Sequence, residues 1–334
     1  MKDHFDAVME KFLIPISDLT LPISDSTYFL RRDKSFVFAE GYCHPPGALW
    51  GMIIKYPRPD GHIDVFGRPY SWTHREYVNG ELTIVPFDRQ VENQFKAAPE
   101  LRKIQGRKPP FAVNFVKFPL DGFPGYFDNR NSLRILRREH EWIDRAVKET
   151  CALLEVDHRT VGVTGSLSYG RVEDDIDIVF FGAPQENAAI AERIRIFKRG
   201  HPEAKVVELG KEWPLRFYYA GTLICPFFKY DSPESIPLPE CEMKVLEENL
   251  SFRAIVDDDL HSYYLPAIVT LAEVEQEGTR MREDLPLIVY DGSMRGELRK
   301  GDRVSLNADL VSVTTPLWKK RTALLITRWG QIRK

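Results

Sequence analysis

The residues most able to do chemistry lie between Val161 and Gly182, a segment that reads VGVTGSLSYGRVEDDIDIVFFG. Asp175 and Asp177 open its second apolar run. In an extended strand, side chains two residues apart project to the same side, so both carboxylates should share one face. Two carboxylates on one face can hold a divalent cation such as Mg²⁺, which prefers oxygen ligands.

A glycine–serine turn precedes the two aspartates. Gly165 and Ser166 follow the first apolar run, and a glycine at such a turn lets the backbone approach a ligand closely. Backbone N–H groups and the serine hydroxyl could then bind phosphate oxygens. An isolated acidic tetrad is often only the solvated start of a strand, but the turn and the flanking strands favour the functional interpretation. An EF-hand loop is excluded because its glycine and final glutamate are missing.

The elements around this segment predict an α/β unit. Apolar residues recur at helical spacing from Asn131 to about Val156, so a helix should lead directly into the first strand. After the second strand, ENAAIAERIRIFKRG predicts a helix and AKVVELG a strand. RFYYAGTLICPFF predicts a hairpin that turns at Ala220 and Gly221.

Short strand-like segments lie on both sides of this unit. Before it they are separated by turn residues such as Asn79-Gly80, which indicates a mostly antiparallel module. After it, strands with Gly and Asp turns predict a closed or half-closed barrel. The expected parts are an N-terminal β-rich module (1–100), an irregular linker or cover (101–130), the α/β domain (131–237) and a C-terminal β-barrel-like module (238–334).

The central segment resembles the nucleotidyltransferase superfamily typified by DNA polymerase beta. The residues that carry the resemblance are Gly165-Ser166, Ser168, Gly170 and the Asp175-Ile176-Asp177 triplet that opens the next strand, at the spacing of the minimal members. The resemblance implies an α+β fold. It would contain a polymerase-beta-like nucleotidyltransferase core with a mixed sheet, flanked by small β modules.

The resemblance also implies a reaction. A nucleoside monophosphate would move from a nucleoside triphosphate to an acceptor hydroxyl, and pyrophosphate would leave. Asp175 and Asp177 would bind Mg²⁺ or Mn²⁺, while Gly165 and Ser166 would hold phosphate. Such transfer requires little from the protein besides metals and positioned groups that neutralise phosphate charge.

The family uses a third carboxylate on a later strand. Glu208, in KVVELG, is the preferred candidate because its apolar setting matches the family pattern, which would place it on a neighbouring strand. The alternative is the strand GTLICPFF, where Cys225 would occupy the acid position and indicate weakened or lost catalysis. The second hypothesis is therefore a catalytically incomplete nucleotide- or nucleic-acid-binding protein of the same fold. A transferase that modifies a protein hydroxyl would use the same site.

Composition limits the other possibilities. The chain has 334 residues, of which 43% are hydrophobic and 28% charged, enough for about two folded domains. A formal net charge of -3 argues against a globally basic nucleic-acid-binding protein, so such binding would need a local patch. The C-terminal run offers one, in which basic residues alternate with tryptophans that could stack on bases. It includes Lys319, Lys320, Arg321 and Trp329.

Cysteine usage and the N-terminus favour a cytoplasmic protein. The four cysteines are far apart and form no CxxC pair, and we interpret them as reduced thiols. The N-terminus lacks the basic region and apolar run of a signal peptide, and no apolar stretch has the length of a membrane span. His44 and His62 lie beside turns, where a structural role is the more common one.

Overall fold

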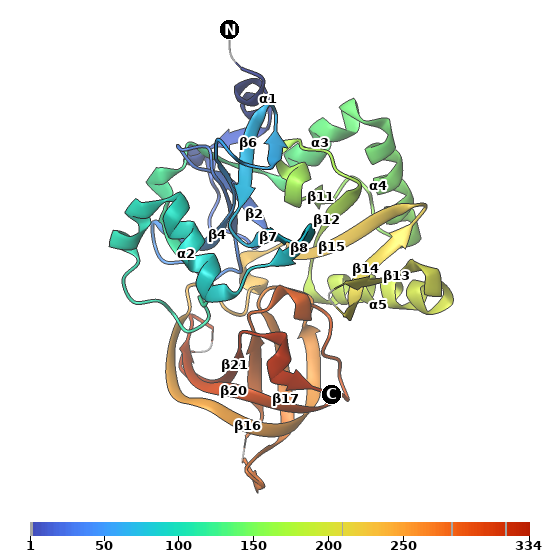
Figure 1. Cartoon of the computed structure of the whole chain (residues 1–334). Helices are drawn as coiled ribbons and strands as arrows, with labels where there is room; N and C mark the ends of the chain where they lie inside the picture. The colour runs from blue at the N-terminus through green and yellow to red at the C-terminus, as the bar shows by residue number, and fades with distance from the viewer. Residues whose placement is uncertain (1–2, 209, 282, 318) are drawn as a thin grey trace.

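The computed structural model describes residues 3–334 except Leu209, Arg282 and Trp318, and for Trp329 it describes the backbone only. The fold is α+β, as expected, with three main sheets that follow one another along the chain. In Figure 1 the first two sheets lie side by side above the C-terminal strands. Among the described residues, no helix is both long enough and apolar enough to cross a membrane.

The first sheet has the strand order β1-β10-β2-β3-β4-β6-β5, and β9 pairs with β4. Residues 101–130, expected to be irregular, supply two of these strands, because short apolar segments between prolines and glycines pair with β4, β1 and β2. Its strands are β1 (Leu13–Pro15), β2 (Thr27–Leu30), β3 (Phe36–Ala39), β4 (Ala48–Pro57), β5 (Ile63–Val65), β6 (Arg68–Trp72), β9 (Val116–Pro119) and β10 (Gly125–Phe127).

Two helices and a hairpin accompany this sheet. Helix α1 (His4–Phe12) starts at Asp3, whose carboxylate accepts the Asp6 N–H, and it buries Phe5, Met9 and Phe12 at helical spacing. Helix α2 spans Phe87–Ala97. The hairpin of β7 (Arg75–Val78) and β8 (Glu81–Ile84) forms a separate sheet and turns at Asn79 and Gly80, both with positive φ, as this turn type requires.

The central sheet has the order β11-β12-β15-β14-β13. It is mixed, as expected, because β12 and β15 are parallel while the other pairs are antiparallel. The predicted hairpin is present, with positive φ at Ala220 and Gly221. The strands are β11 (Gly162–Val163), β12 (Asp175–Gly182), β13 (Lys205–Glu208), β14 (Lys211–Tyr219) and β15 (Thr222–Tyr230), and helix α5 (Pro184–Gly200) follows β12.

The single helix predicted before β11 is two helices. Helix α3 (Asn129–Glu139) begins at Asp128, which accepts the Asn131 N–H at 2.7 Å. His140 then leaves the helical conformation, with φ -130°, and α4 (Glu141–Leu153) starts in a new direction. The apolar residues of both helices, Leu133 and Leu136 before the break and Ile143 and Val147 after it, pack into the same core.

The C-terminal strands close into a ring, since β16 pairs with both β17 and β20. The ring order is β16-β17-β19-β21-β20, and its interior is filled by apolar side chains. The strands are β16 (Glu242–His261), β17 (Ala267–Gln276), β18 (Thr279–Arg280), β19 (Leu285–Val289), β20 (Arg303–Thr314), β21 (Arg321–Ile326) and β22 (Ile332–Arg333).

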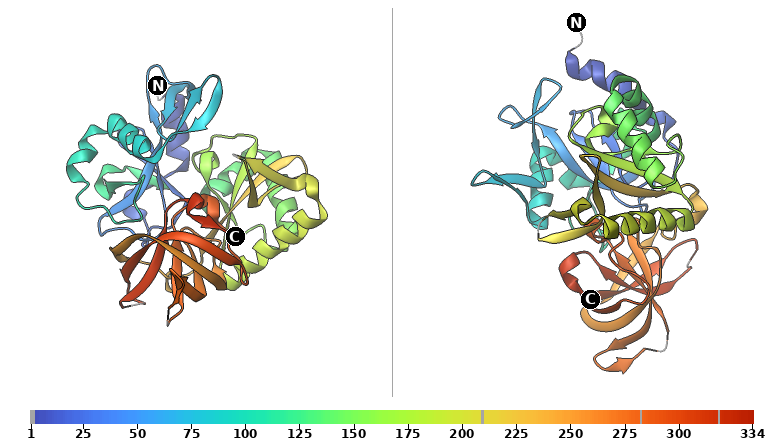
Figure 2. Two further views of the ribbon diagram at one scale, coloured as in Figure 1. Left: turned by 60° about the horizontal axis from the view of Figure 1, so that its bottom comes forward. Right: turned by 90° about the vertical axis from the view of Figure 1, so that its right-hand side faces the viewer.

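Shared cores fix the three parts against one another. One core contains Phe5 of α1 together with Ile176 of β12, and another contains Trp50 of β4 together with Leu325 of β21. In the left view of Figure 2 the three parts surround a common centre. Residues distant in sequence therefore meet where the parts join.

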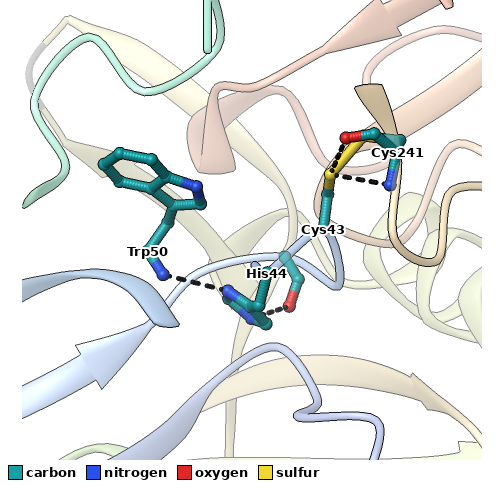
Figure 3. Close-up of a disulfide and its surroundings, with 5 residues drawn as sticks. Cys43, His44, Trp50 and Cys241 are labelled. Atoms are coloured by element: carbon teal, nitrogen blue, oxygen red, sulfur yellow. Dashed lines mark hydrogen bonds between the residues drawn. A yellow bond between two sulfur atoms is a disulfide. The ribbon is translucent and has the colours of Figure 1, made fainter. Parts of the chain in front are cut away.

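A disulfide also joins the first and last parts. Cys43 and Cys241 are bonded across 198 residues of sequence, with their Cα atoms 5.4 Å apart, and the Cys241 N–H lies 3.0 Å from the Cys43 sulfur (Figure 3). The expectation of reduced thiols was therefore wrong for these two cysteines, because sequence spacing gives no information on a contact made by the tertiary fold. Cys151 and Cys225 are free and buried.

His44, next to this disulfide, has a structural role. Its Nδ1 accepts the Trp50 N–H at 3.1 Å, and its Nε2 lies 3.2 Å from the Gly41 carbonyl (Figure 3). Burial lowers the pKa of His44 to about 4, so the ring is neutral and donates through Nε2.

Candidate metal and phosphate site

Asp175, Asp177 and Cys225 form one compact group. Each side chain offers a ligand atom, and these atoms all lie within 4.8 Å of one another. The parallel pairing of β12 and β15 places Cys225 directly opposite Asp177. The two aspartates share a face of β12, as their spacing predicts, while Ile176 and Ile178 between and after them are buried in the core.

The glycine–serine turn lies against this group. Gly165 has φ +63°, and a Cβ at this position would overlap with the Asp177 carboxylate oxygen Oδ2. The Thr164 N–H donates to the Asp177 backbone carbonyl at 2.8 Å, which holds the turn beside β12. The structure therefore brings Gly165 against Asp177, with Ser166 next in the same turn, and only glycine allows this approach.

The N-terminal helix supports the turn from behind. The 3-10 helix η4 (Gly165–Tyr169) ends at Gly170, with φ +83°, and a Cβ there would come within 2.6 Å of the Phe12 ring of α1. The Arg171 N–H donates to the Ser166 carbonyl at 3.1 Å. The geometry of the turn thus depends on contacts with the first part of the chain.

The environment favours protons on this group. Burial, together with the charge of Asp175, raises the pKa of Asp177 to about 7. Burial and the nearby Asp177 raise the pKa of Cys225 well above its usual range, so the thiol is neutral at pH 7. A neutral thiol beside a partly protonated carboxylate can form a hydrogen bond, and a bound cation would favour the ionised carboxylate.

Four cations surround the acidic group. Arg216 of β14 and Arg75 of β7 lower the pKa of Asp177, opposing its burial. Lys55 of β4 donates to the Tyr169 hydroxyl at 2.8 Å, and burial, with Arg171 and Arg75 nearby, lowers the pKa of Lys55 to about 7. Lys55, Arg75 and Arg216 come from separate elements that meet only in the folded chain, so the sequence pattern predicted none of these three, whereas Arg171 lies within the central segment itself.

Glu208 does not join this group. Its strand, β13, is the edge of the central sheet and is separated from β12 by β14 and β15, so the expected place on a neighbouring strand is wrong. The carboxylate instead pairs with Arg216 at 2.6 Å, and the Arg216 guanidinium lies 4.1 Å from the centre of the Trp213 ring. Glu208 therefore acts on the acidic group through its ion pair with Arg216.

The two carboxylates fit a cation that keeps some of its coordination positions free for other ligands. The carboxylates of Asp175 and Asp177 suit Mg²⁺ or Mn²⁺, which can complete their coordination with water and phosphate oxygens. The neutral thiol of Cys225 is a poor ligand for such hard ions. Among the described residues, no third carboxylate belongs to the group.

The other candidates from the sequence lie elsewhere. Lys319, Lys320 and Arg321 are exposed at the start of β21, so a nucleic-acid contact there stays a prediction. The side chain of Trp329 and the whole of Trp318 lie outside the described residues. His62 packs against the rings of Trp72 and Tyr77, which accounts for it structurally.

Comparison with known proteins gives no further information on this site. Comparison with models of protein families, with curated proteins and with solved structures found no match to this chain. The assignment of the site therefore depends on its own residues.

Proposed function

We propose that this chain binds a nucleoside triphosphate together with a divalent cation, at a site of the DNA polymerase beta type. Asp175 and Asp177 would hold Mg²⁺ or Mn²⁺, and the Gly165-Ser166 turn would contact phosphate. The observation that carries the proposal is the approach of Gly165 to Asp177, which places backbone against the carboxylate where any side chain would block it.

The charges around the group support an anionic ligand. Lys55, Arg75, Arg171 and Arg216 balance the two aspartates and the two glutamates paired with arginines, Glu173 and Glu208. A bound divalent cation would then leave an excess of positive charge. Such an excess matches a triphosphate better than a neutral ligand.

Nucleotidyl transfer is the reaction that a complete site of this kind carries out. The cation, when bound, would neutralise developing charge on the phosphates. Asp175 and Asp177 would hold this cation in place, and Arg75 and Arg216 would stabilise negative charge on the leaving pyrophosphate. The acceptor hydroxyl would attack the α-phosphorus as the bond to the pyrophosphate oxygen breaks, and its proton would pass to solvent or a nearby base.

Cys225 favours the second candidate, a protein that binds nucleotide and transfers weakly or not at all. It stands opposite Asp177, at the position where the family pattern has a carboxylate, and its neutral thiol cannot serve as a base. Glu208 cannot replace it, since it is held by Arg216 on the edge strand. Triphosphate binding is therefore the conclusion, and transfer is the activity to be tested.

The test compares binding and turnover in the same preparations. We expect the affinity for a nucleoside triphosphate to fall at least about tenfold when Mg²⁺ is chelated, and similarly in Asp175→Asn and Asp177→Asn. Asp257→Asn, an exposed barrel aspartate paired with Lys300, is the matched control and should change nothing. Equal affinity with and without metal would contradict the proposal. Pyrophosphate release from each labelled triphosphate measures transfer separately.

A further inference from the structure

A cavity opens where the three parts of the chain meet. Its volume is about 350 Å³, within the range of pockets that enclose small molecules. Cys225 and Arg216 form part of its wall, so it is continuous with the acidic group. The rest of the wall comes from all three parts, including Phe38 and Glu40 of the first, Trp213 and Phe227 of the second, and Tyr290 and Arg295 of the last.

Several polar atoms in this wall are buried and have no hydrogen-bond partner in the part of the chain that the structure describes. They are His74 Nδ1, Trp213 Nε1, Tyr290 Oη and Arg295 Nε, all from residues that line the cavity. Tyr290 is only 5% exposed, so water outside the cavity does not reach it easily. Leaving such a group unpaired is unfavourable, and a polar ligand in the cavity would remove this cost.

The same wall is rich in aromatic rings. Phe111 stacks on Tyr290 with ring centroids 4.3 Å apart and fixes the orientation of its ring. Planar heteroaromatic groups stack well on such surfaces, and they carry polar edges that hydrogen-bond. The aromatic residues that line the cavity are Phe38, Phe87, Phe115, Trp213, Phe227 and Tyr290.

Glu40 adds a neutral hydrogen-bonding group. Burial, reinforced by the charges of Asp25 and Asp291 and opposed by Arg295, raises the pKa of Glu40 to about 8. At pH 7 its carboxyl group therefore both donates and accepts. Arg295 itself pairs with Asp25 at 2.8 Å, so its charge is already neutralised on that side.

We propose that this cavity binds a nucleobase, as the base site of the triphosphate whose phosphates lie at Asp175 and Asp177. The rings of the wall enclose the base, and Tyr290 Oη and Trp213 Nε1 bond its polar edge. A cavity of this size has room for one nucleoside. The inference rests on the proposed function for its link to the phosphates, while the cavity alone carries the nucleobase assignment.

The experiment measures binding of the four nucleosides, which carry no phosphate, by calorimetry with EDTA present. At least one nucleoside should bind, and Tyr290→Phe should weaken its binding about five- to tenfold. The melting temperature should be unchanged or higher, since the hydroxyl has no hydrogen-bond partner among the described residues. Tyr126→Phe, which removes a hydroxyl bonded to the Asp18 carbonyl, is the matched control and should leave nucleoside affinity unchanged.

The outcomes separate the two proposals. If no nucleoside binds, or if Tyr290→Phe has no effect, the base site is overturned even where metal-dependent triphosphate binding persists. If nucleoside binding depends on Tyr290 but triphosphate affinity is the same with and without metal, the result supports the base site and contradicts the proposed function. Simultaneous binding of nucleoside and triphosphate without competition would show an acceptor in the cavity and overturn its role as the base site.

Discussion

The thiol of Cys225 lies opposite the carboxylate of Asp177, on the parallel strand next to it. Their ligand atoms and those of Asp175 lie within 4.8 Å of one another, close enough for three carboxylates to share cations if residue 225 were acidic. For the proposed function, this pair of residues is where we expect the difference between nucleotide binding alone and nucleotidyl transfer to lie.

Replacing the thiol of Cys225 by a carboxylate tests whether residue 225 limits cation binding and transfer. In Cys225→Asp we expect Mn²⁺ affinity to increase about tenfold or more, since a third oxygen ligand is added, and pyrophosphate release to rise with it. Cys225→Ser, which is similar in size to the natural side chain, should change neither. Metal titration and a pyrophosphate assay on the two variants provide the measurement. Unaltered metal affinity in Cys225→Asp would show that residue 225 does not face the cation.

The contact between Gly165 and Asp177 predicts a strong effect of a single methyl group. Gly165→Ala should abolish metal-dependent triphosphate binding, because the Cβ would overlap with Oδ2 of Asp177 and displace the carboxylate. Gly221→Ala is a matched control, since Gly221 also has positive φ, +83°, but a Cβ there meets no atom of the described residues within 4 Å. Both variants should lose about 1 kcal/mol of stability from backbone strain. Equal triphosphate binding by the two variants would refute the contact.

Glu208 should matter little to function. Its ion pair with Arg216 is partly exposed, and such pairs contribute about 0–1 kcal/mol. Glu208→Gln should therefore lower triphosphate affinity by a factor of about two to three at most, whereas Arg216→Ala should lower it more than tenfold through loss of a charge near phosphate. Competition binding under identical salt conditions measures both. A loss in Glu208→Gln as large as that in Asp177→Asn would restore Glu208 as a metal ligand.

The disulfide should contribute to stability. Cys43 and Cys241 close a loop of 198 residues, and bonds of this kind stabilise proteins by about 2–4 kcal/mol, chiefly by restricting the unfolded chain. Reductant should lower the urea midpoint of the natural protein, and the Cys43→Ser/Cys241→Ser variant should have the lower midpoint with or without reductant. An identical midpoint in all conditions would show that the bond does not form in solution.

The raised pKa of Glu40 predicts that the stability of the protein depends on pH. The pKa of Glu40 is about 8 in the folded protein and near 4.5 in the unfolded chain. Its contribution to the free energy of unfolding is therefore fully present below pH 4.5 and is lost as the pH rises through 8. In Glu40→Gln, which keeps a neutral polar side chain, unfolding free energy should decline less between pH 5 and pH 8.5, by about 1–3 kcal/mol. Urea unfolding at several pH values gives the comparison. Parallel curves for the two proteins would contradict the raised pKa.

Local patterns in the sequence determined the parts of the site that depend on a few neighbouring residues. Alternation along β12 places Asp175 and Asp177 on one face, and the glycine of the Gly165-Ser166 turn supplies the left-handed conformation found there. The α+β order and the Ala220-Gly221 hairpin follow from the same kind of signal. The broken helix at His140 did not, because the apolar residues keep the same helical period on both sides of the break and so give no local signal for it.

Only the tertiary structure decided what surrounds the two aspartates. Strand order and register place Cys225 opposite Asp177 and leave Glu208 on the edge, and both are set by packing between distant segments rather than by local propensity. The approach of Lys55 and Arg75 and the Cys43–Cys241 bond arise from the same long-range contacts. The sequence alone thus determined an acidic pair beside a glycine–serine turn. The fold determined that the third position is a thiol and that a shared aromatic cavity lies next to it.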